Sequence, residues 1–207
     1  MDKIKVALIL GTRPEAIKLI PVYRALAENS KFDPVLISTG QHKEMLVEVF
    51  NLFGVKPDIE LNVMDKNQTL SDLSSKLFAR LGNIFSSSKY SLASVQGDTT
   101  TALIAAIVAH YHKIPVAHVE AGLRTYNKWA PFPEESNRRM IGTIADFHFT
   151  PTETASNALF KEGISQGVMK VGNTVIDSLF LIQKKVNSNI HTYNSPFAYF
   201  FCSLRNF

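Results

Sequence analysis

The chain has 207 residues, which is enough for a full hydrophobic core and favours a single domain. Apolar residues make up 45% of it and charged residues 19%, which excludes a disordered or collagen-like chain. The net charge of +4 suits an anionic small-molecule ligand, but it is too small and too dispersed to indicate nucleic-acid binding.

Short β-branched runs alternate with segments of helical periodicity along most of the chain. In chain order, strands are expected at residues 4–10, 34–38, 91–95, 116–119, 147–150 and 168–171. Helices are expected at residues 14–27, 43–53, 69–85, 99–111, 134–145 and 152–161. This alternation predicts an α/β fold, a doubly wound and mostly parallel sheet with helices on both faces. Ligands of such folds bind beyond the carboxyl ends of the strands.

The regular pattern ends near residue 186. We therefore expect a Rossmann-like domain over residues 1–186 and an atypical tail over residues 187–207, which is first rich in asparagine and then aromatic. The longest strongly apolar stretch, residues 102–109, is far below the roughly 18 residues that a membrane span needs. The amino terminus lacks the pattern of a signal peptide, and the single cysteine, Cys202, suits a reducing compartment. We expect a cytoplasmic protein that binds neither membrane nor nucleic acid.

The first candidate motif, GTRPEAIK at residues 11–18, directly follows the first expected strand. As structure alone it is a strand-to-helix turn, in which Thr12 and Glu15 form a capping box. That interpretation does not account for Arg13, because the helix dipole disfavours a cation in the first turn. An anion bound at the helix amino terminus would account for it. Arg13 and Lys18 are therefore candidate anion ligands.

Two further motifs follow expected strands. In the stretch at residues 39–45, His42 lies at a helix start, where it is either a capping residue or a ligand. In the stretch QGDTTT at residues 96–101, Asp98 immediately precedes a helix. Asp98 is therefore either an N-cap, the commonest use of aspartate at this place, or a catalytic carboxylate. The residues alone leave both interpretations open.

The fourth motif, HVEAGLRT at residues 118–125, ends a strand that reads as buried. An acid at the end of such a strand needs a partner or a chemical task, and Arg124 is a candidate partner for Glu120. Further on, Glu134 and Arg138 are four residues apart and share a helix face. They form either a surface ion pair or a carboxylate beside a phosphate-binding arginine.

The sequence lacks several motifs of known chemistry. It has no G-x-G-x-x-G fingerprint of dinucleotide binding, no Walker A loop, and no spacing of histidine and cysteine typical of a metal site. We therefore expect a site without metal or cofactor, in which three carboxylates and several cations lie at strand ends. Such a set suits proton transfer on an anionic substrate.

Six motifs in this order resemble the bacterial non-hydrolysing UDP-N-acetylglucosamine 2-epimerases: GTRPEAIK, TGQHKEML, GDTTTA, HVEAGLRT, PFPEESNRR and VGNTVIDSL. The resemblance covers about residues 3–186. It implies one Rossmann-like domain of a two-domain, GT-B-like architecture, and a homodimer that needs no cofactor. It also implies interconversion of UDP-N-acetylglucosamine (UDP-GlcNAc) and UDP-N-acetylmannosamine (UDP-ManNAc), by elimination of UDP to 2-acetamidoglucal and its re-addition.

The resemblance also assigns roles to residues. The family's three catalytic acids map onto Asp98, Glu120 and Glu134. The positions implied to bind the substrate are Arg13, Lys18, Gln41, His42 and Arg138. Of these, Gln41 and His42 lie in the stretch where bacterial members bind a second, activating molecule of UDP-GlcNAc.

Two alternatives to an active epimerase stay open. The family's second domain is expected to begin near residue 195, where this sequence reads PFAYFFCSLRNF and ends. The first alternative is therefore a truncated and catalytically silent fragment. The second is a glycosyltransferase of the same architecture, which transfers the sugar to an acceptor and leaves the proton at sugar C2 in place.

Overall fold

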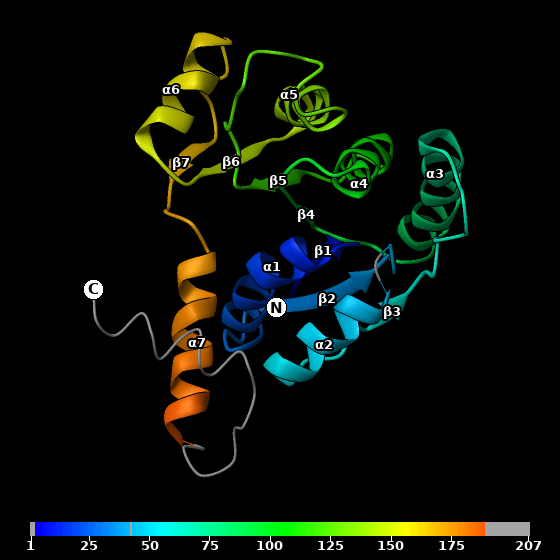
Figure 1. Ribbon diagram of the computed structural model, residues 1–207, viewed down its shortest axis with the longest axis vertical. Helices are drawn as coiled ribbons and strands as arrows, with labels where there is room; N and C mark the ends of the chain where they lie inside the picture. Colours follow the sequence, from blue (N-terminus) through cyan, green and yellow to red (C-terminus); the bar gives the residue numbers. More distant parts are fainter. Residues whose placement is uncertain (1–2, 42, 189–207) are drawn as a thin grey trace.

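The computed structural model describes residues 3–41 and 43–188. Its elements in chain order are β1 (Ile4–Leu10), α1 (Arg13–Ala27), β2 (Phe32–Ser38), α2 (Lys43–Phe53), β3 (Ile59–Glu60), α3 (Leu70–Ser87), β4 (Leu92–Gln96), α4 (Thr100–Tyr111), β5 (Val116–Val119), α5 (Glu134–Ile144), β6 (Phe147–Thr150), α6 (Glu153–Lys161), β7 (Val168–Lys170) and α7 (Val175–Ser188) (Figure 1). Every expected strand and helix is present, with its ends within two residues of the expected ones. The structure adds β3 and α7, and α7 runs two residues past the boundary placed at 186.

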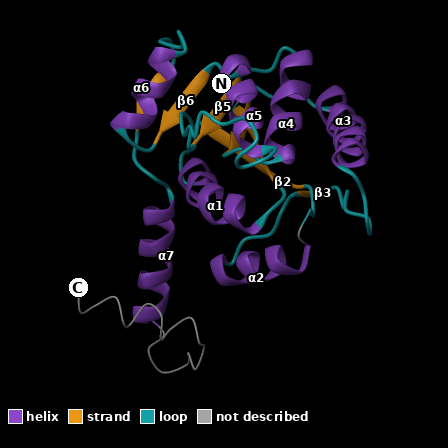
Figure 2. Cartoon of the chain, turned by 45° about the horizontal axis from the view of Figure 1, so that its top comes forward, coloured by secondary structure: helices purple, strands orange, loops and turns teal. Residues whose placement is uncertain are grey.

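The strands described by the structure form one parallel sheet in the order β3-β2-β1-β4-β5-β6-β7. Helices α1, α2 and α7 lie on one face, and α3, α4 and α5 on the other (Figures 1 and 2). The expected doubly wound α/β fold is therefore confirmed. The direction of winding reverses between β1 and β4, and this switch point is where such folds bind their ligands.

The core follows from the composition of β1, IKVALIL. Successive side chains of a strand point to opposite faces of the sheet. Ala7 and Ile9 join the apolar cluster under α3 and α4, and Val6, Leu8 and Leu10 join the cluster under α1 and α2. Because both faces are covered, β1 is apolar at every position from Val6 to Leu10 and shows no alternation there, while Lys5 lies in its less buried first part.

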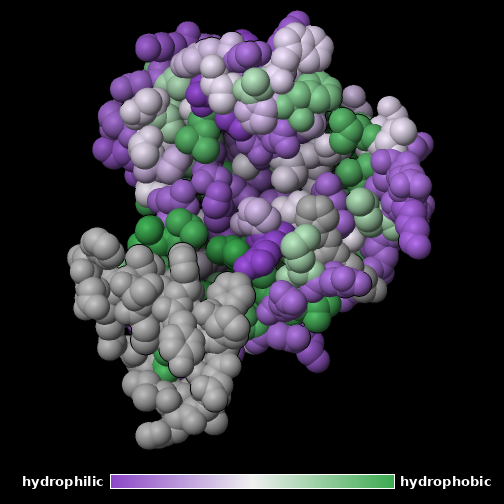
Figure 3. All heavy atoms as spheres, viewed as in Figure 1, coloured by the Kyte–Doolittle hydropathy of each residue, from purple (hydrophilic) through white to green (hydrophobic). Residues whose placement is uncertain are grey.

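Helix α7 packs against α1 and α2 through Leu181 and Ile182. Its other side exposes Ile176 and Phe180, and apolar surface gathers near the start of the helix in Figure 3. Of the helices in the described ranges, none has both the length and the apolar character required to cross a membrane.

Candidate active site

The turn between β1 and α1 is built around the buried carboxylate of Glu15. This carboxylate accepts the backbone N–H groups of Gly11 (2.9 Å) and Thr12 (2.7 Å), as one half of the expected capping box. It also accepts the hydroxyl groups of Thr12 (2.8 Å) and Thr99 (2.6 Å). Burial raises the pKa of Glu15 above its usual value, against hydrogen bonds that lower it. Since Thr99 belongs to the next turn, Glu15 joins the two turns at the switch point.

In the turn between β4 and α4, the N-cap is Thr99, whose hydroxyl accepts the N–H of Ala102 at 3.0 Å. The interpretation of Asp98 as the N-cap is therefore wrong. Its carboxylate instead receives Nη2 of Arg138 at 2.5 Å, while its backbone carbonyl accepts the amide of Asn137 at 2.8 Å. Burial raises the pKa of Asp98, although the guanidinium of Arg138 opposes the shift. Asp98 is thus a fixed carboxylate with an increased tendency to hold a proton.

Glu120 directly follows β5 and adopts a left-handed backbone conformation with φ of 63°. Such a conformation is uncommon and strained for a residue with a side chain, and strained residues cluster at functional sites. Its Oε2 accepts Nζ of Lys18 and Nε2 of Gln96, each at 2.5 Å. Its Oε1 accepts Nδ2 of Asn173 at 2.9 Å. The expected partner, Arg124, is not among these donors.

Arg124 instead binds Glu162, with Nε to Oε1 at 2.8 Å and Nη2 to Oε2 at 2.7 Å. The arginine side chain is only 1% exposed, so this is a buried bidentate ion pair. It ties the loop after β5 to the end of α6. The proposed pairing of Glu120 with Arg124 is wrong because a partner far away in sequence has the better geometry.

Of the two glutamates that begin α5, Glu135 has a structural task. It is fully buried, and its carboxylate accepts the backbone N–H groups of Thr125 and Tyr126, each at 3.0 Å. Arg138 also lies 3.4 Å from it. Glu135 therefore fixes the loop that leads from β5 to α5.

Glu134 is placed differently. Its Oε2 is buried and has no hydrogen-bond partner in the described part of the chain, and the same holds for Nε of Arg138. The surface ion pair considered for these two residues is absent, because Arg138 pairs with Asp98 and Glu135. Buried polar atoms are rarely left unpaired in proteins, so a water molecule or a polar ligand is expected beside these two atoms.

The remaining candidates lie near the same edge of the sheet. Arg13 is the first residue of α1 and is half-buried. Gln41 accepts the hydroxyl of Thr101, at the start of α4, at 3.0 Å. His42 lies outside the described residues.

The three acids lie at one edge of the sheet, where the carboxyl ends of the strands meet. Asp98 and Glu120 follow the adjacent strands β4 and β5, and the charges of Glu134 and Glu120 both act to raise the pKa of Asp98. Lys18 and Arg138 reach this group from α1 and α5. The structure thus brings together the three expected carboxylates and two of the expected cations.

His118 is a buried neighbour of these acids that the sequence analysis did not single out. It is buried on β5, and its Nε2 donates to the carbonyl of Gly97 at 2.7 Å. Burial lowers the pKa of His118 from 6.5 to about 4, so the ring is neutral at pH 7. It holds the backbone immediately before Asp98. Across the described ranges, no group of three or more His, Cys, Asp and Glu side chains is arranged to hold a metal ion.

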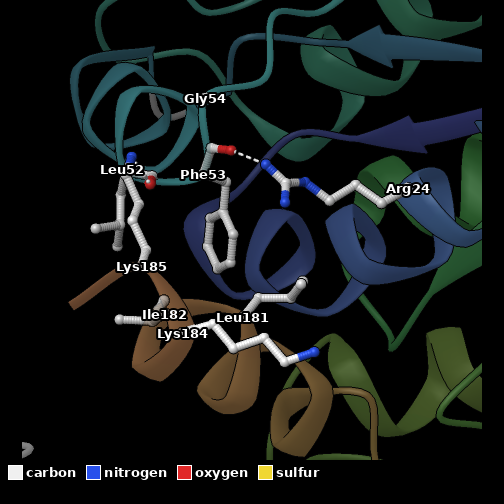
Figure 4. Close-up of a pocket in the computed structure, with 8 residues that line it drawn as sticks. All are labelled: Arg24, Leu52, Phe53, Gly54, Leu181, Ile182, Lys184 and Lys185. Atoms are coloured by element: carbon white, nitrogen blue, oxygen red, sulfur yellow. Dashed lines mark hydrogen bonds between the residues drawn. The ribbon is translucent and has the colours of Figure 1, made fainter. Parts of the chain in front are cut away.

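A groove of about 440 Å³ lies away from this edge, between α7 and the end of α2 (Figure 4). Two of the three cations that line it, Arg24 and Lys185, are engaged in structural bonds: Arg24 donates to the carbonyl of Phe53, and Lys185 donates to that of Leu52 at 2.8 Å. Cations at these last carbonyls stabilise a helix carboxyl terminus. The groove therefore joins α1, α2 and α7 and is a poor candidate for the active site.

Comparison with known proteins gives consistent results. A family described as UDP-N-acetylglucosamine 2-epimerase matches residues 24–203. The UDP-N-acetylglucosamine 2-epimerase of Campylobacter jejuni is 44% identical over 186 residues, which is 89% of this chain and 49% of that protein. The enzyme of the same description from Bacillus subtilis is 46% identical over 86% of this chain and 47% of its own length. This chain spans about half the length of the curated relatives it matches.

Solved structures agree with this result. A structure of UDP-GlcNAc 2-epimerase from Neisseria meningitidis bound to UDP-GlcNAc superposes with a TM-score of 0.85 at 43% identity, over 88% of this chain and 50% of that one. MurG from Acinetobacter baumannii superposes with a TM-score of 0.54 at 10% identity, which shows likeness of fold alone.

Proposed function

Because this chain belongs to the UDP-N-acetylglucosamine 2-epimerase family, we propose that it supplies the acid and base groups that interconvert UDP-GlcNAc and UDP-ManNAc. The observation that carries the proposal is the grouping of Asp98, Glu120 and Glu134 at one sheet edge, with Lys18 and Arg138 beside them. The relative from N. meningitidis, whose structure contains UDP-GlcNAc, supports this class of substrate.

The chemistry requires two kinds of group. Removal of the proton at sugar C2 and its return on the other face need carboxyl groups that exchange protons. Asp98, whose pKa is raised by burial, is suited to hold a proton, and Glu120 is a carboxylate fixed by three donors. The buried and unpaired Oε2 of Glu134 is a third acceptor at the same edge.

The departing UDP carries negative charge that has to be stabilised. Arg13 begins α1, and the amino terminus of a helix favours an anion. Lys18 and Arg138 add positive charge on the inner side of the same edge. We place the diphosphate near the start of α1, with Gln41 and His42 as further residues that contact the nucleotide sugar.

Turnover is proposed for a protein that also contains the second half of the relatives' length. We expect such a protein to be a cytoplasmic homodimer that needs no metal or cofactor. Elimination requires preorganised donors around the diphosphate in a closed cleft, and losing one such donor commonly costs about 10² to 10³ in rate. A polypeptide of only these 207 residues is therefore expected to be catalytically silent.

The test uses this chain joined to the carboxy-terminal half of the B. subtilis relative. Exchange of the C2 proton of UDP-GlcNAc is followed by NMR in deuterated water, and Glu120→Gln is expected to lower kcat by about 10² to 10⁴-fold with little change in KM. Lys170→Ala is the control, because it removes only an exposed ion pair with Glu153.

Three outcomes would contradict the proposal. A near-normal kcat in Glu120→Gln would make Glu120 structural. Sugar transfer to an acceptor without exchange at C2 would favour the glycosyltransferase. Epimerisation by the 207-residue polypeptide at about 1 to 10³ per second would refute the need for the second half.

A further inference from the structure

The carboxylate of Glu120 is held from two directions. Lys18 and Gln96 both donate to Oε2, and Asn173 is the donor to Oε1 in the described chain. A carboxylate held at one oxygen alone can still turn about that oxygen. The bond to the second oxygen therefore decides the plane of the group and the direction in which its lone pairs point.

Asn173 lies between β7 and α7, 53 residues further along the chain than Glu120. Its side chain makes a second bond, because Oδ1 accepts the N–H of Val175, the first residue of α7, at 3.1 Å. The oxygen of this amide thus caps the start of α7, and its nitrogen holds the carboxylate of Glu120. The position of α7 and the orientation of Glu120 are linked through a single side chain.

A second contact ties α7 to the same acid. The buried hydroxyl of Ser178, on the first turns of α7, donates to the carbonyl of Ile17 on α1. Ile17 immediately precedes Lys18, whose ammonium group lies on Oε2 of Glu120. Both oxygens of Glu120 are therefore supported from elements that α7 contacts.

We propose that Asn173 is a positioning residue, which sets the orientation of the Glu120 carboxylate and couples it to the seating of α7. The inference rests on the proposed function, since Glu120 is an acid of that mechanism. A reacting group has to be held in one orientation, and hydrogen-bonded partners behind it provide that orientation. A shift of α7 would withdraw the donor from Oε1, and it would also disturb the bond of Ser178 to Ile17, next to Lys18.

The substitution Asn173→Asp separates the two bonds of Asn173. Aspartate keeps an oxygen for the N–H of Val175, but it replaces the donating amide with a second carboxylate oxygen against Glu120. The charged groups already facing Glu120 are Lys18 from α1 and Asp98 from the turn after β4. Two carboxylates in contact favour a shared proton over two negative charges.

The matched control is Asn29→Asp. Asn29 makes the same kind of local bond, since its Oδ1 accepts the N–H of Lys31 at 3.1 Å. It lies in an exposed turn between α1 and β2, away from the acids. Both variants exchange an amide for a carboxylate within the same local motif. Only in Asn173→Asp does the new carboxylate face Glu120.

In the grafted enzyme, Asn173→Asp is expected to lower kcat at neutral pH by about 10 to 100-fold, to change KM little, and to move the pH–rate profile to higher pH. Asn29→Asp should leave all three unchanged. A fall in kcat without movement of the profile would indicate a merely structural role and overturn the inference.

A second measurement does not depend on turnover. In the 207-residue chain, the ¹³C resonance of the Glu120 carboxyl group is followed against pH, and its midpoint in Asn173→Asp should lie about 1 unit or more above that of the Asn29→Asp chain. An unmoved midpoint overturns the inference even if the grafted enzyme is active. Absence of epimerisation in the unsubstituted graft refutes the proposed function and leaves this measurement decisive for Asn173.

If Asn173→Asp does not fold, Asn173→Ser takes its place. Serine keeps a capping oxygen for the N–H of Val175 and removes the amide that reaches Glu120. The Glu120 resonance should then change its pH dependence, while the amide hydrogen exchange of α7 should match that of the unsubstituted chain. Loss of α7 protection together with an unchanged Glu120 resonance would limit Asn173 to capping and overturn the inference.

Discussion

Two turns at the same sheet edge use an acid in opposite ways. In the β1–α1 turn, Glu15 is buried and its carboxylate is engaged by four donors that hold the local backbone and the next turn. In the β4–α4 turn, Thr99 performs the capping, so the carboxylate of Asp98 points to Arg138. Both helices have a threonine N-cap, so the position of the acid makes the difference: Glu15, three residues after Thr12, completes a capping box, whereas Asp98, one residue before Thr99, pairs with Arg138.

The largest expected effect is on turnover in the second turn. In the grafted enzyme, Asp98→Asn should lower kcat by about 10² to 10⁴-fold, because asparagine keeps an oxygen for Arg138 but cannot exchange a proton. Its urea unfolding midpoint should stay close to that of the unsubstituted enzyme. A large loss of stability with normal turnover would reverse the comparison between the two turns.

The next effect is on stability in the first turn. Glu15→Ala leaves the buried N–H groups of Gly11 and Thr12 without their acceptor, and each such loss costs about 1 to 3 kcal/mol. We expect the free energy of unfolding of the 207-residue chain to fall by about 2 to 6 kcal/mol. Urea denaturation measures it, and an unchanged midpoint would show that Glu15 is dispensable for the fold.

The third effect concerns pH and the backbone before Asp98. The pKa of His118 is about 4 in the folded chain against an ordinary 6.5, so between these values the unfolded chain binds more protons. Its contribution is therefore present above pH 6.5 and is lost as the pH falls towards about 4. The loss amounts to about 3 kcal/mol.

His118→Gln tests this directly, because glutamine keeps an N–H for the carbonyl of Gly97 and does not titrate. The variant should lose less stability than the parent between pH 6.5 and pH 4 in denaturation curves. Part of the slope should remain, because burial also lowers the pKa of His148. Equal slopes in variant and parent would assign the acid sensitivity to other groups.

The sequence predicts the sheet well because its strands and helices carry strong local periodicity. It misses β3, whose two residues are too few to show a pattern, and α7, whose apolar face is partly exposed. Asp98 and Glu120 were singled out because each follows an expected strand, and Glu134 because it begins a helix. Their role as catalytic acids came from the family resemblance and stays a prediction. Whether Asp98 caps or reacts was beyond reach, since Thr99, one residue later, offers the same chemistry.

The bonds that select partners were harder to predict than the acids themselves. Arg124 lies four residues from Glu120 in sequence, yet it binds Glu162. Glu120 instead accepts a hydrogen bond from Asn173, which is 53 residues further along the chain. These pairings depend on how α6 and α7 are seated on the sheet, and local sequence spacing carries no information on that seating. VGNTVIDSL marked the region of Asn173 without indicating its contact.

The strand order also has a consequence for how the chain folds during its synthesis. Taken in order from the amino terminus, each new strand adds at an edge: β2 and β3 on one side of β1, then β4 to β7 on the other. A chain leaving the ribosome amino terminus first never has to insert a strand between two already paired. However, β1 keeps one apolar edge open until β4 emerges, and open edges invite pairing with other chains. The edge of β1 that stays unpaired during this interval is the one that β4 covers when the switch point forms.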